Sequence, residues 1–198
     1  MNKITLTILS ASILSASAFA TCTKDTCKEP VDMNWTKTSY TITSKDTAGK
    51  DYYLDVDNIQ KFVSVGIADE KVGKTNVGAL SAGIGMSATV NKNIYTGANL
   101  DVEATHNQNK QVFGATAEVK GGYVVNNRLA TYAILGVKDV FHDSDVKGVG
   151  LGIGVGLDYR VCSKSIVEVD FKNYDMKVEK NGPDYQNNSV GIKFKYLF

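Results

Sequence analysis

The most regular part of the chain alternates between apolar residues and glycine. From Gly148 to Val161, every odd position is apolar and every even position is glycine, until Asp158 and Arg160 end the pattern. A period of two residues indicates a β-strand, because successive side chains of a strand point to opposite faces. One face of this strand is apolar and the other is almost without side chains, which suits a narrow barrel whose outside meets lipid. The 14 residues of this range exceed the roughly 9–11 that a tilted strand needs to cross a bilayer.

The same alternation predicts seven further strands, in residues 59–68, 77–90, 94–105, 112–125, 129–138, 166–177 and 190–198. Tight turns are predicted after the second, fourth and sixth strands, at 91–93, 126–128 and 162–165. Polar loops are expected after the first, third, fifth and seventh strands, the last three at 106–111, 139–147 and 179–188. This alternation of short and long connections is expected of an even-numbered barrel with both ends of the chain on the periplasmic side. We therefore predict an all-β fold, an eight-stranded antiparallel up-and-down transmembrane β-barrel.

Charged residues of these strands fall on the face opposite the apolar stripe. A basic side chain facing lipid at the bilayer midplane would cost about 2–4 kcal/mol, so these charges must point inward, where opposite signs can pair. Six acids and six bases are predicted to form this lumen network: Asp101, Glu103, Glu118, Asp158, Glu168 and Asp170 with Lys120, Lys138, Arg160, Lys172, Lys193 and Lys195. The balance predicts a packed polar interior and no wide aqueous pore.

The first 20 residues resemble a secretory signal peptide. A short basic start precedes a mostly apolar stretch, and Ala18 and Ala20 form a cleavage site of the usual small-residue type. Residues 21–58 are predicted to form a periplasmic N-terminal segment, and residues 59–198 are predicted to form the barrel domain. Residues 39–56 contain two short strand-like arms that can pair as a hairpin. We expect this hairpin outside the bilayer, although its two arms would turn eight strands into ten if they joined the barrel.

Composition limits which disulfide bonds, metal sites and partners the chain can have. In an oxidising compartment a disulfide bond between Cys22 and Cys27 can close a small loop, which leaves Cys162 as a thiol. The alternative is a disulfide bond from Cys162 to either of the two. The chain has three Cys and two His, and no Cys-x-x-Cys motif, which argues against a metal site. The net charge of +1 gives no indication of nucleic-acid binding. The sequon at Asn34 also fits a bacterial glycosylation pattern, but a chance match explains it as well.

The chain resembles the small bacterial outer-membrane β-barrel family typified by the OmpA transmembrane domain and OmpX. The resemblance rests on the strand 148–161, on the run 171–175, and on the final alternating strand with Tyr196 and the terminal Phe198. It implies an outer-membrane location with membrane lipid as a partner, and recognition of the terminal aromatic strand by the barrel-assembly machinery. It also implies a monomer without cofactor. No peptidoglycan-binding domain follows the barrel in this sequence.

Three function classes follow from these observations. The first is a structural or surface-interaction protein of the outer membrane, with four short connections outside. The second is a soluble exported barrel that binds an apolar ligand, as lipocalins do, but such a barrel would need apolar residues inside. The third is a barrel enzyme acting on envelope lipid. His142, Asp143 and Ser144 have the residue types of a hydrolase triad, but neighbours in one loop do not easily adopt its geometry. His106 has no acidic or Ser partner that the sequence fixes near it. We therefore expect a protein that is not an enzyme.

Overall fold

The computed structural model describes residues 40–45, 51–73, 75–90, 93–107, 110–126, 128–141, 148–178 and 184–198. Side chains are described from residue 59 onward within these ranges, except those of residues 106, 107, 110 and 111. The predictions on Ala18, Ala20, Cys22, Cys27, Asn34, His142 and Ser144 fall outside the described residues. In the part of the chain that is described, no helix is long and apolar enough to cross a membrane.

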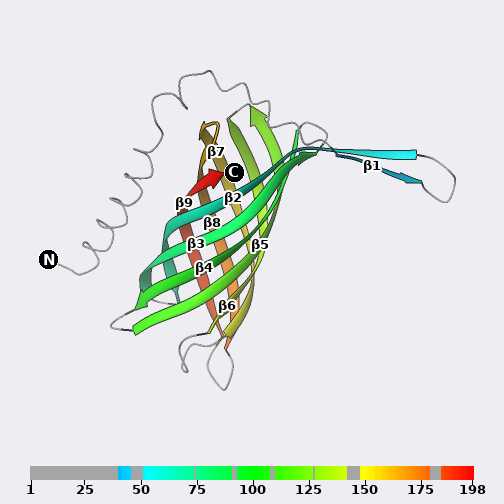
Figure 1. Ribbon diagram of the computed structural model, residues 1–198. Coiled ribbons are helices and arrows are strands. Elements are labelled where there is room, and N and C mark those ends of the chain that lie inside the picture. Colours follow the sequence, from blue (N-terminus) through cyan, green and yellow to red (C-terminus); the bar gives the residue numbers. More distant parts are fainter. Residues whose placement is uncertain are drawn as a thin grey trace.

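The described chain forms nine antiparallel strands in one sheet, in sequence order. They are β1 (Tyr40–Lys45), β2 (Asp51–Val72), β3 (Thr75–Val90), β4 (Ile94–Asn107), β5 (Lys110–Asn126), β6 (Leu129–Val140), β7 (Gly148–Cys162), β8 (Ser165–Val178) and β9 (Tyr185–Leu197). An additional pairing of β2 with β9, running from Phe62 against Leu197 to Val72 against Asn187, closes the sheet. Strands β2–β9 thus form a closed eight-stranded up-and-down barrel, which Figure 1 shows from the side, and the predicted fold class is confirmed.

The possible hairpin at 39–56 does not add two strands to the barrel. Strand β1 pairs only with the first residues of β2, from Asp51 to Val56, and projects from one end of the barrel (Figure 1). The second arm of the predicted hairpin is continuous with the first barrel strand, because β2 runs on to Val72 with a register shift between Asp57 and Gln60. The barrel therefore closes with eight strands and β1 lies outside it.

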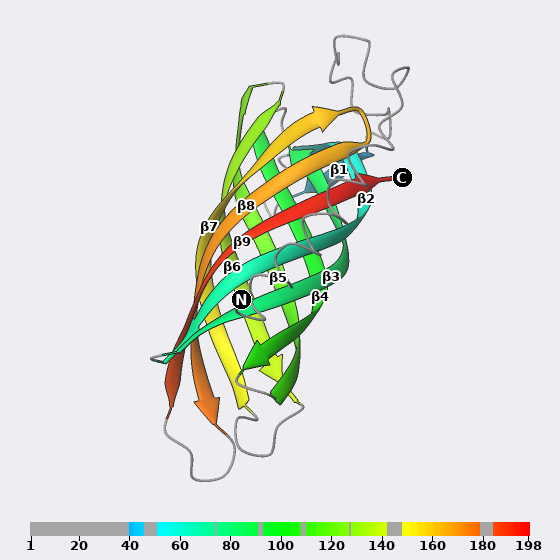
Figure 2. The same ribbon diagram turned by 90° about the vertical axis from the view of Figure 1, so that its left-hand side faces the viewer.

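The two ends of the barrel differ in their connections. The tight-turn end carries the turns at 91–93, 127–128 and 163–164 and the end of β9, and it is the end from which β1 projects. The opposite end, here called the loop end, carries the connections at 73–74, 108–109, 141–147 and 179–184 (Figure 2). Turns at the three predicted tight positions are confirmed.

The expected polar loops after the first and third strands are wrong. There β2 and β3 are joined at 73–74, where Gly73 has a φ of 60°, and β4 and β5 are joined at 108–109. The reason is that inward and outward residues continue to alternate beyond the predicted ends. Glu70, for example, is buried while its neighbours Asp69 and Lys71 are exposed. Polar residues on both faces can belong to a strand where its outer face meets water above the lipid.

The outer face of the barrel is apolar and the inner face is polar. Leu151, Ile153 and Leu135 have 72%, 66% and 60% of their surfaces exposed on the outside. Two of the inward glycines of β7 lie beneath aromatic rings. A Cβ at Gly152 would overlap the ring of Tyr174, and one at Gly156 would overlap the ring of Tyr132. The glycines of the alternating strand therefore make room for large side chains that cross the lumen from neighbouring strands.

Candidate functional site

The lumen is the part of the molecule in which polar side chains gather. All twelve charged residues predicted for the lumen are buried, with exposures from 0% for Glu168 to 9% for Glu103. Glu70 is buried as well, which gives seven acids and six bases among the described buried side chains. They come from β2 and from β4 to β9, so that seven of the eight barrel strands contribute to the network.

Asp158 organises the part of the network nearest the tight-turn end. Both of its carboxylate oxygens accept hydrogen bonds from the Lys195 ammonium, at 2.7 and 2.9 Å. The hydroxyl groups of Tyr95 and Tyr132 donate to the same carboxylate at 2.9 and 2.8 Å. Their rings stack with centroids 5.2 Å apart. One carboxylate on β7 is thereby held by groups on β4, β6 and β9.

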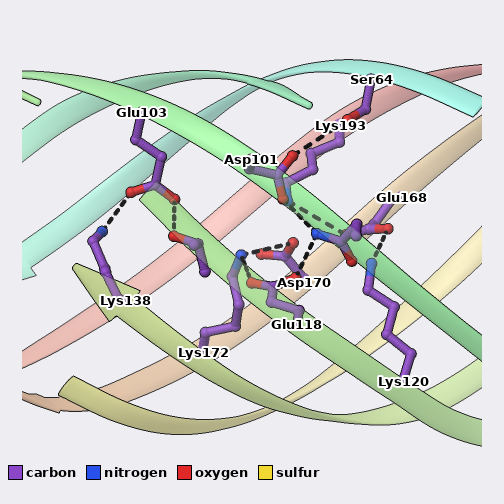
Figure 3. A network of polar contacts seen from close by, with 12 residues as sticks. Ser64, Asp101, Glu103, Glu118, Lys120, Lys138, Glu168, Asp170, Lys172 and Lys193 are labelled. Carbon is purple, nitrogen blue, oxygen red and sulfur yellow. Dashed lines mark hydrogen bonds and ion pairs between the residues drawn. The ribbon is translucent and has the colours of Figure 1, made fainter. Parts of the chain in front are cut away.

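Glu168 occupies the centre of the network. It is fully buried, forms an ion pair with Lys120 at 2.6 Å and a second ion pair with Lys195. Lys193 lies 4.0 Å from its other oxygen and pairs with Asp101 at 2.8 Å (Figure 3). Negatively and positively charged side chains thus alternate from Asp158 through Lys195 and Glu168 to the middle of the barrel.

A second group of ion pairs fills the lumen toward the loop end. The Lys172 ammonium lies 2.9 Å from Glu118 and 3.3 Å from Asp170, and the hydroxyl group of Tyr174 donates to Glu118 at 2.9 Å. Figure 3 shows Lys172 between the two carboxylates.

Lys138 lies between two acids from different strands. Its ammonium is 2.6 Å from Glu70 on β2 and 2.6 Å from Glu103 on β4. The amide group of Asn187 also donates to Glu70, at 3.2 Å, and the hydroxyl group of Thr116 donates to Glu103 at 3.2 Å. Its three charged members come from β2, β4 and β6, no two of which are neighbours in the sheet.

Several members of the network lie outside the predicted set. Glu70 falls in a predicted loop, because the first predicted strand ends at residue 68. Gln60 accepts a hydrogen bond from Arg160 at 2.7 Å, and Asn99 donates to Glu118 at 3.1 Å. Extending the two-residue period past Ala68 would have placed Glu70 inside. The neutral members also lie at inward positions of the two-residue period, but the predicted network contains only charged residues.

Two of the remaining predicted residues lie on the outer face, away from the network. Tyr196 and Phe198 are 44% and 73% exposed on the outside at the tight-turn end. Cys162 is buried, at the end of β7. His106 lies in β4. Among the described residues, no group of three or more His, Cys, Asp or Glu side chains could hold a metal ion.

The arrangement of the lumen is suited to closing the barrel from within. Most of the buried charges pair with an opposite charge on another strand, as Glu168 does with Lys120 and Lys138 does with Glu103, so that removing one member would leave a charge without compensation in a desolvated interior. The lumen is also filled by apolar clusters, one of Phe62, Ile166 and Leu197 near the tight-turn end and one of Val140, Tyr174 and Met176 near the loop end. The interior therefore resembles a packed core with charged layers between two apolar ones.

No protein-family model matches the chain. No curated protein matches it either. Solved structures with a similar fold include Ail, the attachment invasion locus protein of Yersinia pestis, crystallised with the heparin analogue sucrose octasulfate. Ail has 12% sequence identity and a TM-score of 0.50, over 71% of this chain and 99% of Ail.

Two other similar structures are Neisserial surface protein A, with 11% identity and a TM-score of 0.46 over 72% of this chain and 99% of that one, and the N-terminal β-barrel domain of Pseudomonas aeruginosa OprF, with 16% identity and a TM-score of 0.40 over 70% and 99%. The likeness to Ail confirms the predicted resemblance at the level of the fold: the chain has the fold of the small outer-membrane barrels.

Proposed function

We propose that this chain is an integral protein of the bacterial outer membrane with a structural or surface-interaction role. The observation that carries the proposal is the inverted distribution of side chains. Large apolar residues such as Leu151 and Ile153 are exposed around the outside, while the charged residues are buried inside. In water such an outer surface would be an aggregation hazard, whereas in a bilayer it meets hydrocarbon.

The strands have the length that this environment requires. The shortest barrel strand, β6, has 12 residues, more than the roughly 9–11 that span a bilayer at the usual tilt. Outward aromatic residues, Tyr123, Tyr159 and Tyr196, are exposed at the tight-turn end, as interfacial belts are in membrane proteins. The pairing of β2 with β9 closes the sheet, so that the backbone groups of both edge strands form hydrogen bonds. A sheet that spans a membrane needs this closure.

The lumen gives no support to a soluble ligand-binding barrel. A carrier for apolar molecules would keep an apolar cavity inside, but the middle of this lumen is occupied by ion pairs such as Glu168 with Lys120 and Lys193 with Asp101. The same packing favours a barrel without a wide aqueous pore. We accordingly propose that the barrel serves as a stable membrane anchor for its outer connections.

We further propose that the protein is not an enzyme, and that its partners act at its surface. The loop with His142, Asp143 and Ser144 offers the residue types of a hydrolase in a spacing that does not favour triad geometry. A double substitution His142→Ala with Ser144→Ala should leave envelope lipids and outer-membrane protein processing unchanged. A change in either would favour the enzyme instead.

Heat-modifiability in an outer-membrane fraction tests the main proposal. A folded membrane barrel resists detergent until it is boiled, so we expect unboiled and boiled samples to migrate differently on a gel. We also expect the protein to fractionate with the outer membrane. Recovery from the soluble periplasm without a mobility shift would contradict the lipid-facing assignment.

A further inference from the structure

Exposed charges are distributed unequally between the two ends of the barrel. The comparison covers the residues whose side chains the structure describes, which excludes 40–58 and the undescribed parts of the connections. Within that set, the acids that are exposed or half-exposed are Asp69, Asp139, Asp175 and Asp184, and all four lie toward the loop end. Lys71 and Lys177 lie near them and offset part of their charge.

The tight-turn end has the opposite character. Arg128 lies in the turn between β5 and β6, Lys164 lies in the turn between β7 and β8, and Lys61 lies on β2 next to the end of β9; all three are exposed. No exposed acid accompanies them among the described side chains. Among the side chains that the structure describes, Arg128, Lys164 and Lys61 thus form a cationic rim at the tight-turn end.

Backbone hydrogen bonds fix these cations in order around the rim. The amide of Arg160 donates to the carbonyl of Arg128 at 2.8 Å, which holds that turn against β7. The amide of Leu197 donates to the carbonyl of Lys164 at 2.8 Å, and the amide of Phe198 donates to the carbonyl of Lys61 at 3.1 Å. The three positions are thus parts of the sheet framework. Arg128 precedes β6, Lys164 precedes β8 and Lys61 lies on β2, so that one strand separates each position from the next around the barrel.

Two of the three cations, Arg128 and Lys164, have an outward aromatic residue beside them. Tyr159 pairs with Leu129, the residue after Arg128, and Tyr196 pairs with Ser165, the residue after Lys164. Both rings are more than two-fifths exposed. Amphipathic aromatic side chains on the outside of a membrane protein lie at the level of the lipid headgroups. The guanidinium and ammonium groups next to them are then within reach of the lipid phosphates.

We propose that this cationic rim binds the phosphate headgroups of anionic phospholipids in the membrane leaflet at the tight-turn end. The inference rests on the proposed membrane function. Guanidinium groups bind phosphate oxygens through paired hydrogen bonds, and ammonium groups bind them as point charges. Binding there orients the barrel in the bilayer, because the four acids at the loop end outnumber Lys71 and Lys177 among the described exposed side chains and make that end less favourable for the same headgroups.

The test measures lipid selectivity of the full mature chain in phosphatidylcholine vesicles. Spin-labelled phosphatidylglycerol and spin-labelled phosphatidylcholine report by electron paramagnetic resonance how strongly each lipid associates with the barrel. We expect roughly a twofold or larger preference for phosphatidylglycerol, since each Lys or Arg near an anionic lipid surface contributes measurably to the attraction. The preference should decrease at high salt, which screens exposed charges.

Three double variants test whether the lipid preference depends on the charges of the rim or on the fold. Arg128→Gln with Lys164→Gln should decrease the preference and leave only the part that Lys61 contributes. Lys71→Gln with Lys177→Gln, the matched control at the loop end, should leave it unchanged. Arg128→Lys with Lys164→Arg keeps both charges and should also retain it. Equal preference for the two lipids in the unaltered protein, or an equal decrease in the two Gln variants, would overturn the inference.

Each preparation is also tested for heat-modifiability, which keeps the two proposals distinguishable. A mobility shift with no lipid preference rejects the cationic rim and leaves the membrane barrel intact. Loss of the shift in the unaltered protein rejects the membrane barrel, and with it the inference built on it.

Discussion

The stability of this barrel depends on individual buried charges to an unusual degree for so small a structure. Glu168 is fully buried and faces Lys120, Lys193 and Lys195. An isolated ion in such a place would carry a large desolvation cost, and its partners offset that cost only while every member is present. A substitution at one residue of the network therefore affects its partners. The outward apolar residues have no such partners, so a different apolar side chain can replace them.

Replacing Glu168 by Gln should lower the free energy of unfolding by about 3–5 kcal/mol, because Lys120 and Lys195 lose their shared counter-charge in a buried position. Urea unfolding of the protein in lipid vesicles measures the effect. Asp175→Asn serves as the control, since Asp175 lies on the same strand but is exposed. It should change the free energy by less than about 0.5 kcal/mol. Equal effects of the two substitutions would contradict a structural role for the lumen network.

The inward glycines allow a second comparison between single residues. Gly152→Ala places a methyl group where the ring of Tyr174 lies, and we expect a loss of about 1–3 kcal/mol from overpacking. Gly121→Ala is the matched control, because a Cβ there would meet no atom within 4 Å. That substitution should be neutral, or stabilising by about 0.4–1 kcal/mol through the unfolded chain. The same unfolding measurement checks both, and a neutral Gly152→Ala would show that the ring can move aside.

At the scale of elements, the chain separates a closed barrel from a projecting hairpin. Strand β2 belongs to both, since its first part pairs with β1 and the rest pairs with β3 and β9. The barrel closes through eleven residue pairs between β2 and β9, none of which involves residues 51–56. The hairpin is thus added to a sheet that is already complete.

Removing residues 21–56 should therefore leave a barrel that still folds. We expect the shortened chain, refolded into detergent micelles or vesicles, to keep its heat-dependent mobility shift, because every pair that closes the barrel is retained. A gel comparison of boiled and unboiled samples, with the unshortened chain beside it, provides the measurement. Loss of the shift would mean that β1 is needed for closure, as a ten-stranded arrangement would require.

At the scale of the whole molecule, the packed lumen determines what can pass through the barrel. Charged layers from seven strands and apolar clusters toward both ends occupy the interior. A small barrel filled in this way leaves no channel of the width that porins have. The molecule is better suited to remain in the membrane than to conduct through it.

Reconstitution should therefore give no porin-like permeability. We expect vesicles that contain the protein to exclude small sugars in an osmotic swelling measurement, as vesicles without protein do. A porin reconstituted in parallel provides the positive control. Swelling at a rate close to that of the porin would show that the lumen opens widely and would contradict a packed interior.

The amino-acid pattern by itself determined the class of the barrel and the face on which each charge lies. A strand has a strict period of two, so that assigning Leu151 and Ile153 to lipid assigns the intervening glycines to the lumen. The same parity placed Asp158 and Lys195 inside, although they are 37 residues apart. Periodicity is a local property and can be read without knowledge of the partners.

The tertiary structure decided how far each strand extends and which charges meet. Glu70 lies in a segment that reads as a polar loop, because a strand above the lipid has polar residues on both faces. Its pairing with Lys138, 68 positions away, depends on strand tilt and closure. Likewise, whether residues 51–56 joined the barrel depended on how β2 meets β9, a long-range pairing that no local pattern specifies. Register around a closed sheet is a property of the whole barrel, and it alone selects the partner of each buried charge.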